Sequence, residues 1–181
     1  MDERRFGLQT VQRRRITLRG VKPIGTYQHR FENFYLYGAV CPCTGEGDFM
    51  VACRLEGTAF ARFIPQILME QPTYHHLFLL DNSATHALPP RDFPTNVTLL
   101  FQPPYAPELN PIERVWQDAK RHLAWRNFSS LYDLQAAVET IFLAYSDDHL
   151  ASLTAADYLI QAISASAPCL AQPTPPLPIA A

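Results

Sequence analysis

The sequence lacks any apolar run of the 18 or so residues that a membrane-spanning helix requires. Its start, MDERRFGLQTVQRRR, also lacks the apolar stretch of a secretory signal peptide. Both absences favour a cytoplasmic protein. No internal repeat is visible, and 181 residues suit a single domain that is long enough to bury a sizeable core.

Cysteine is scarce, and its spacing fits no common zinc-binding pattern. Cys41 and Cys43 form a C-x-C pair, Cys53 follows after nine residues, and Cys169 is distant. Without a secretory signal, we interpret the four as reduced thiols, with Cys41 and Cys43 flanking a turn. The cysteines therefore do not predict a metal site.

Charge of either sign is modest, since charged residues make up 18% of the chain and the net charge is -2. The distribution is nevertheless uneven. Residues 1–30 hold eight Lys or Arg against two acids, a net of +6, whereas residues 31–181 hold seven against fifteen, a net of -8. The segment RRITLRG fits a phosphate-contacting surface and a solvated strand edge equally well, and charge alone does not separate the two.

The order of elements predicts an α/β fold with a mixed sheet and helices. Aromatic and β-branched residues on either side of TGEG predict an antiparallel hairpin over residues 31–53 that turns at 44–47. A helix follows, with Thr58 as its N-cap and a kink or break at Pro65, then buried strands in HHLFLLDN and VTLLFQPP. Further helices are expected over residues 110–125, 130–145 and 155–163. Residues 1–165 then form the domain, and the Pro-rich residues 166–181 form a disordered or extended tail.

Three carboxylates stand where catalysis would need them: Asp2 before a strand-like stretch, Asp81 at a strand end, and Glu113 in the first turn of a helix. A strand end is rigid, yet its side chain can face the open rim of a sheet, where ligands bind. Three convergent carboxylates can hold two hard divalent cations through oxygen ligands.

Each acid also has a purely structural interpretation. Asn110, Pro111 and Glu113 fit a capping box in which Glu113 reaches back to the cap residue. Asp81 can turn the chain after its strand, and Asp2 can be a solvated terminal residue.

The sequence motifs that flank these acids resemble those of one family, the DDE endonuclease domain of mariner-like insertion-sequence transposases. That family shows an Asp-Glu start with an Arg-rich strand and R-G-x-x-P, here DERRFGLQTVQRRRITLRGVKP. An Asp-Asn pair with a following His is present as LDNSATH, and the family's proline-rich word is present as PPYAPELNPIERVW. The resemblance spans about residues 2–145 in the expected order, and the long word is far more specific than an isolated acid.

The resemblance implies a ribonuclease-H-like fold in which Asp2, Asp81 and Glu113 bind two Mg²⁺ ions, with Mn²⁺ as a substitute. The implied activity is hydrolysis of double-stranded DNA at the ends of a mobile element, followed by strand transfer to a target that is expected to be a TA dinucleotide. The implied partners are element-end and target DNA and a second copy of the chain. The implied location is the cytoplasm, in association with the nucleoid.

Neighbouring residues receive weaker assignments. His86 is expected to position a phosphate or to support the metal site, unless it is merely structural. Trp116 is expected in the core, and Lys120 is either a DNA contact or a solvated lysine. The better candidates for phosphate contact, taken as a group, are Arg13, Arg14, Arg15 and Arg19.

The sequence departs from the family pattern at its start. Only Met1 precedes Asp2, where the family has an apolar strand, and the usual helix-turn-helix region is absent. The first strand is therefore expected to be truncated, either because an upstream helix-turn-helix reading frame completes the protein or because the copy is decaying. The alternatives to an active transposase domain are an inert remnant or DNA-binding accessory protein, and another ribonuclease-H-like nuclease such as a resolvase, which the long word disfavours.

Overall fold

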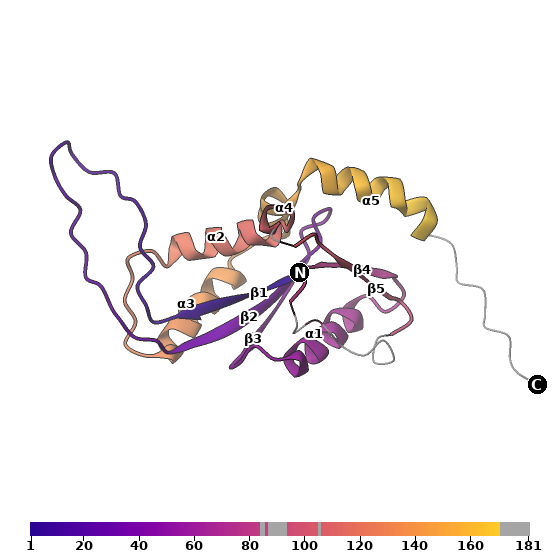
Figure 1. The fold of residues 1–181 in the computed structure, drawn as a ribbon, viewed down its shortest axis with the longest axis horizontal. Helices are drawn as coiled ribbons and strands as arrows, with labels where there is room; N and C mark the ends of the chain where they lie inside the picture. The colour runs from indigo at the N-terminus through magenta and orange to yellow at the C-terminus, as the bar shows by residue number, and fades with distance from the viewer. Residues whose placement is uncertain (84–85, 87–93, 105, 171–181) are drawn as a thin grey trace, which may run out of the picture.

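The computed structural model describes residues 1–83, 86, 94–104 and 106–170, which form five strands and five α-helices (Figure 1). The strands are β1 (Asp2–Gly7), β2 (Asn33–Val40), β3 (Gly47–Ala52), β4 (His76–Leu80) and β5 (Val97–Phe101). The helices are α1 (Gly57–Glu70), α2 (Ile112–His122), α3 (Leu131–Leu143), α4 (Asp147–Thr154) and α5 (Asp157–Leu170), and a short 3-10 turn, Pro107–Leu109, precedes α2. None of these helices is long and apolar enough to cross a membrane.

The predicted hairpin is confirmed. β2 pairs antiparallel with β3 in a register that sets Val40 opposite Gly47, and Cys41 N–H donates to the Glu46 carbonyl at 2.8 Å to close the turn. Gly45 adopts a φ of 82°, a conformation that side-chain-bearing residues rarely adopt. Cys41 and Cys43 lie exposed in this turn with free thiols.

Two apolar clusters lie on opposite faces of the β1-β2-β3 sheet. On one face α2, α3 and α4 pack through residues such as Val115, Trp116 and Val138, while on the other α1 packs through Phe60 and Phe63 together with β4 (Figure 1). Strand side chains alternate between faces, so Phe6 joins the first cluster and Tyr37 joins the second. Neighbouring residues of β1 therefore face different layers.

Several expectations about the helices were wrong. Thr58 lies inside α1, whose N-cap is Glu56. α1 continues past Pro65, so the helix is not broken there, and a kink at Pro65 stays a prediction. α4 was not predicted, and α5 continues to Leu170, so it includes the first five residues of the expected tail. Alanines at 162, 165 and 167, the best helix formers, account for this extension. Residues 171–181 of the tail lie outside the described residues.

The expected mixed sheet is present as two sheets rather than one. The antiparallel β1-β2-β3 sheet and the parallel β4-β5 pair are not hydrogen-bonded strand to strand, although the Met1 amine donates to the Leu79 carbonyl at 3.1 Å. A largely apolar cavity of about 450 Å³ lies beside this contact and is lined by residues that include Ala39, Val40 and Leu77. β5 is also less buried than expected, with Leu100 and Phe101 about half exposed.

Residues 8–32 form a long arm between β1 and β2 that projects away from the domain (Figure 1). The basic segment RRITLRG has no strand structure, which corrects the expectation of an Arg-rich strand there. The base of the arm is attached to residues 125–129: Trp125 Nε1–H donates to the Arg13 carbonyl at 2.9 Å, and Gln28 exchanges two hydrogen bonds with the Phe128 backbone. The tip of the arm is exposed.

Candidate active site

Met1 joins the three segments that carry the predicted catalytic acids. Its amine contacts the end of β4 through Leu79, two residues before Asp81, and its carbonyl accepts from Asn110 Nδ2 at 3.1 Å, three residues before Glu113. The pKa of this amine is lowered to about 6 by burial, against the opposing influence of the negative charges of Asp2, Glu3 and Asp81. The start of β1, the end of β4 and the start of α2 therefore meet at one place.

Asp2 is held by the indole of Trp116, whose Nε1–H donates to Asp2 Oδ2 at 3.0 Å. The indole reaches this position because Gly38, opposite Asp2 in β2, has no side chain: a Cβ there would lie 2.6 Å from the Trp116 ring. Burial raises the pKa of Asp2 to about 6, and the negative charges of Glu113 and Glu3 also raise it. A cation bound nearby would favour the charged form of the Asp2 carboxylate.

Glu113 lies in the first turn of α2 and points to β1 rather than back to the helix cap. Its carboxylate accepts from Arg4 Nη1 at 3.3 and 3.4 Å. Pro111 is the N-cap of α2, and no side chain caps the helix. The Asn110 amide is turned to Met1 and its Oδ1 lacks a hydrogen-bond partner among the described residues. The capping-box interpretation of Glu113 therefore does not hold.

Asp81 is half exposed, one residue beyond β4, and contacts the fully buried His86. His86 Nδ1 lies 3.0 Å from Asp81 Oδ1, and His86 Nε2 lies 2.7 Å from Oε1 of Glu3, which is almost fully buried. The Glu3 contact is a hydrogen bond and the Asp81 carboxylate contact is an ion pair, while Nδ1 also hydrogen-bonds the Asp81 carbonyl oxygen at 3.3 Å. Carboxylate and carbonyl oxygens only accept, so both ring nitrogens donate at once only when both carry a proton. Burial alone would lower the pKa of His86, but the hydrogen bond and charge of Glu3, together with Asp81, raise it.

The donor chemistry suits Mg²⁺ or Mn²⁺, since Asp2, Asp81 and Glu113 all offer carboxylate oxygens. Within residues 1–83, 86, 94–104 and 106–170, however, no three His, Cys, Asp or Glu side chains are grouped closely enough to hold a metal ion. Trp116, His86 and Arg4 each engage one of the three acids. Sharing of one cation by Asp81 and Glu113 stays a prediction.

The expected DNA-contacting residues are separated. Lys120, half-buried on α2, has its pKa lowered to about 8, first by burial and then by the positive charges of Arg4, Arg5 and Arg13, against the raising effect of Glu113. Arg13 donates to the Gln117 carbonyl at 2.9 Å, and the Arg15 guanidinium lies 4.7 Å from the centre of the Trp125 ring. Arg14 and Arg19 are exposed on the arm, whereas His86 is buried and turned to two carboxylates.

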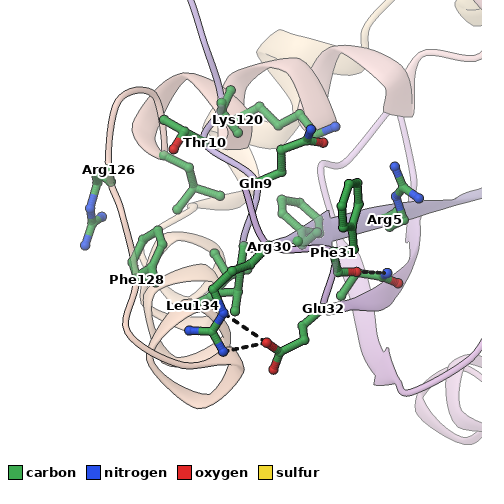
Figure 2. A pocket seen from close by; sticks show the side chains of 16 residues that line it. Arg5, Gln9, Thr10, Arg30, Phe31, Glu32, Lys120, Arg126, Phe128 and Leu134 are labelled. Carbon is green, nitrogen blue, oxygen red and sulfur yellow. Dashed lines mark hydrogen bonds and ion pairs between the residues drawn. The ribbon is translucent and has the colours of Figure 1, made fainter. Parts of the chain in front are cut away.

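A pocket of about 260 Å³ lies between the base of the arm, α2 and the 126–128 connector, and Figure 2 shows it from close by. Its cationic lining residues are Arg5, Arg30, Lys120 and Arg126, and Arg30 is paired with Glu32. The basic surface thus continues from Arg4, beside Glu113, along α2 to the base of the arm.

Sequence reasoning did not find the roles of Glu3 and Arg4, nor the hydrogen bond that Trp116 donates to Asp2. The alternation of side chains along a strand at the start of the chain could have indicated the roles of Glu3 and Arg4. Asp2 and Arg4 share one face of β1 and meet α2, while Glu3 faces the other way. The partners themselves, more than 80 residues away, follow only from the fold.

The chain is similar to known proteins in family and in fold. A family model described as DDE superfamily endonuclease matches residues 1–135. An uncharacterized protein of Sinorhizobium fredii is 38% identical over 84 residues, an alignment that covers 46% of this chain and 62% of that protein. The chain thus spans less than two thirds of the length of this relative.

Two solved structures of a mariner transposase are similar in fold. A pre-cleavage Mos1 transpososome matches with a TM-score of 0.67 at 14% identity, covering 96% of this chain and 56% of that chain. The Mos1 mariner paired end complex with Mn matches with a TM-score of 0.63 at 15% identity, covering 96% and 55%. The expected ribonuclease-H-like α/β fold is confirmed by these likenesses, and the family match over residues 1–135 shows that the chain belongs to the DDE superfamily endonucleases.

Proposed function

We propose that this chain is the catalytic domain of a mariner-like transposase, which cuts DNA strands at the ends of a mobile element and joins them to a target. The observation that carries the proposal is the position of Met1, whose backbone is bonded to the end of β4 and to the start of α2. Asp2, Asp81 and Glu113 each lie within three residues of these contacts. They are the proposed ligands of two Mg²⁺ ions, with Mn²⁺ as a substitute.

Divalent ions bound there would supply an activated water or 3′-hydroxyl and stabilise the leaving oxygen. Two residues of the chain hold the proposed ligands in place. Trp116 sets the orientation of Asp2, and Arg4 balances the charge of Glu113 while the two carboxylates repel each other. A cation that relieves this repulsion binds more tightly than it would to isolated carboxylates.

The proposed nucleic-acid partner is double-stranded DNA, with element ends and a target, proposed to be TA, as its substrates. The basic surface of Arg5, Arg13 and Lys120 supports this partner because cations that release counterions from phosphate supply most non-specific DNA affinity. Arg14, Arg15 and Arg19 would extend the contact along the arm. One fold neighbour is a Mos1 transposase paired-end complex with the left transposon end, and association with the nucleoid would follow from DNA binding of this kind.

The proposed assembly is a homodimer that pairs two element ends. The arm supports it, since Ile16 is 105% exposed and Ile24 is 91% exposed, and neither touches the core clusters. Such apolar side chains in a projecting segment are typical of an interaction surface.

The test is nicking of supercoiled DNA by the full chain in Mg²⁺ or Mn²⁺, compared with Asp81→Asn and Glu113→Gln. Each substitution keeps the side-chain shape and removes a negative charge, so we expect the rate to fall by roughly 100-fold or more while DNA binding is kept. Glu139→Gln, an exposed acid on α3, is the matched control. Undiminished nicking by Asp81→Asn would refute the proposed role, and DNA binding without any nicking by the unaltered chain would favour an accessory function.

A further inference from the structure

His86 occupies an unusual position for a histidine of a loop. Its side chain is fully buried, its ring packs 4.8 Å from the Phe60 ring, and both ring nitrogens contact carboxylates. Neither nitrogen is left to contact a DNA phosphate in this arrangement. The ring instead spans from β1, at Glu3, to the end of β4, at Asp81.

We propose that Glu3 and His86 form a bridge that positions Asp81 relative to Asp2, so that both carboxylates can bind the same pair of divalent cations. The proposal rests on the proposed function, since Asp2 and Asp81 are its metal ligands. Glu3 and His86 are positioning residues, because neither occupies the proposed ligand set.

The two ends of the bridge differ in rigidity. Glu3 is 5% exposed and lies in a strand, with Tyr37 as its partner in β2. The Asp81 side chain is 52% exposed and lies beyond the end of its strand. Its Oδ1 accepts from the neighbouring Ser83 N–H at 3.0 Å, and its carbonyl oxygen lies 3.3 Å from His86 Nδ1. Glu3, held in its strand, therefore restrains the exposed Asp81 through the His86 ring.

The two faces of β1 each hold one residue of this arrangement. Asp2 points to α2 and is oriented by Trp116, while Glu3, the next residue, points to α1 and holds His86. Because adjacent residues of one strand are fixed relative to each other, the strand transmits the position of the first acid to the second. A carboxylate–histidine pair behind a ligand orients that ligand, and loss of such partners typically costs 10–100-fold in metal affinity.

A purely structural role for the buried pair would also lower stability when it is removed, so metal affinity must be measured apart from folding. We would titrate the full chain with Mn²⁺ by calorimetry, without DNA, and record the melting temperature with EDTA. The variants are Glu3→Gln and His86→Ala. Phe63→Leu, in the same apolar cluster, is the control for lost packing.

We expect Mn²⁺ affinity to fall roughly 10- to 100-fold in Glu3→Gln and His86→Ala and to stay unchanged in Phe63→Leu. Unchanged affinity in Glu3→Gln, which keeps the shape of the side chain, overturns the bridge even if His86→Ala fails to fold. An equal loss in Phe63→Leu also overturns it. Asp81→Asn in the same titration separates the proposals: if Asp81→Asn loses affinity and the bridge variants do not, only the bridge fails, whereas unchanged affinity in Asp81→Asn refutes the metal site itself.

Discussion

Asp2 lies at the start of β1, between the indole of Trp116 and the negative charges of Glu113 and Glu3. The chain holds this carboxylate in a place where its charged form is unfavourable without a cation. Its pKa, ordinarily 3.8, is about 6 in the folded chain. Folded protein therefore binds more protons than unfolded protein between these two values, and this residue makes stability fall as the pH rises from about 4 to about 6.

Replacement of Asp2 by Asn should stabilise the metal-free chain at pH 7. The amide keeps an oxygen for the Trp116 N–H and removes a charge that is disfavoured first by burial and then by Glu113 and Glu3. We therefore expect a gain of roughly 2 kcal/mol at pH 7 and little change near pH 4. Thermal unfolding in EDTA at the two pH values measures both. An equal effect at pH 4 and pH 7 would show that charge is not the cause, and Glu139→Gln serves as the exposed control.

At the scale of elements, α2 is attached to the rest of its layer by a polar cluster around Asp118. This carboxylate is 8% exposed and accepts from Tyr145 Oη at 2.9 Å and Arg121 Nη1 at 3.0 Å, with His149 Nε2 at 3.4 Å. Burial alone would raise the pKa of Asp118, but the hydrogen bonds from Tyr145 and His149 lower it, helped by the charges of His122 and Arg121. The cluster joins α2 to the segment that leads into α4.

Because folding lowers the pKa of Asp118, its contribution is present above the ordinary pKa of 3.8 and is lost as the pH falls further. Asp118→Asn should therefore cost roughly 1–3 kcal/mol of unfolding free energy at pH 7 and less at pH 3. Denaturant unfolding at the two pH values checks this. Tyr145→Phe, which removes one donor, should cost about 1 kcal/mol, and a larger cost than that of Asp118→Asn would contradict the central place of the carboxylate.

β1 and β4 are not paired as strands, and the Met1 amine donates to the Leu79 carbonyl next to the 450 Å³ cavity. A short apolar β-strand added before Met1 could pair with β4 and fill this space, in agreement with the family pattern. We expect it to raise the melting temperature, since each buried apolar side chain contributes roughly 1.5–3 kcal/mol, and to increase nicking by fixing Asp2.

A Gly-Ser extension of equal length is the control for this change. It removes the buried Met1 amino terminus equally but offers no apolar side chains to the cavity. If both extensions have the same melting temperature and nicking rate, the cavity does not accept a strand.

At the scale of the whole molecule, the arm of residues 8–32 projects from the domain, and its tip does not pack against the core. Its base is bonded to Trp125, Asn127 and Phe128, while its tip carries exposed apolar and basic side chains. The arm is thus held in direction by the domain and presented to other molecules.

The triple substitution Ile16→Ser, Leu18→Ser and Ile24→Ser should weaken dimerisation without loss of stability, because these side chains are 81% or more exposed. Light scattering over a concentration series, with and without DNA, measures the effect, and the melting temperature should stay within a degree or two. Leu143→Ser on α3, a residue that is 87% exposed, is the matched control. Equal dimerisation of the arm variant and the control would remove the arm from the proposed interface.

The sequence by itself was sufficient for most of the elements and for the identity of the family. The β2-β3 hairpin, β4, β5, α2 and α3 follow from local patterns of apolar residues and turn residues, and the words around Asp81 and Glu113 matched the family before any contact was known. The expectations failed at α4, although the Ser146 side chain is a local N-cap that accepts from His149 N–H, and at the N-cap of α1, where Glu56 makes no side-chain capping bond.

Only the tertiary structure decided what each acid contacts. Trp116 and Asp2 are 114 residues apart, Glu113 and Arg4 are 109 apart, and His86 and Glu3 are 83 apart. No periodicity encodes such pairs, because they depend on how the layers pack. The alternation of β1 places Asp2 and Glu3 on opposite faces, but the packing of α2 on one face and of α1 and β4 on the other gives each carboxylate its partner.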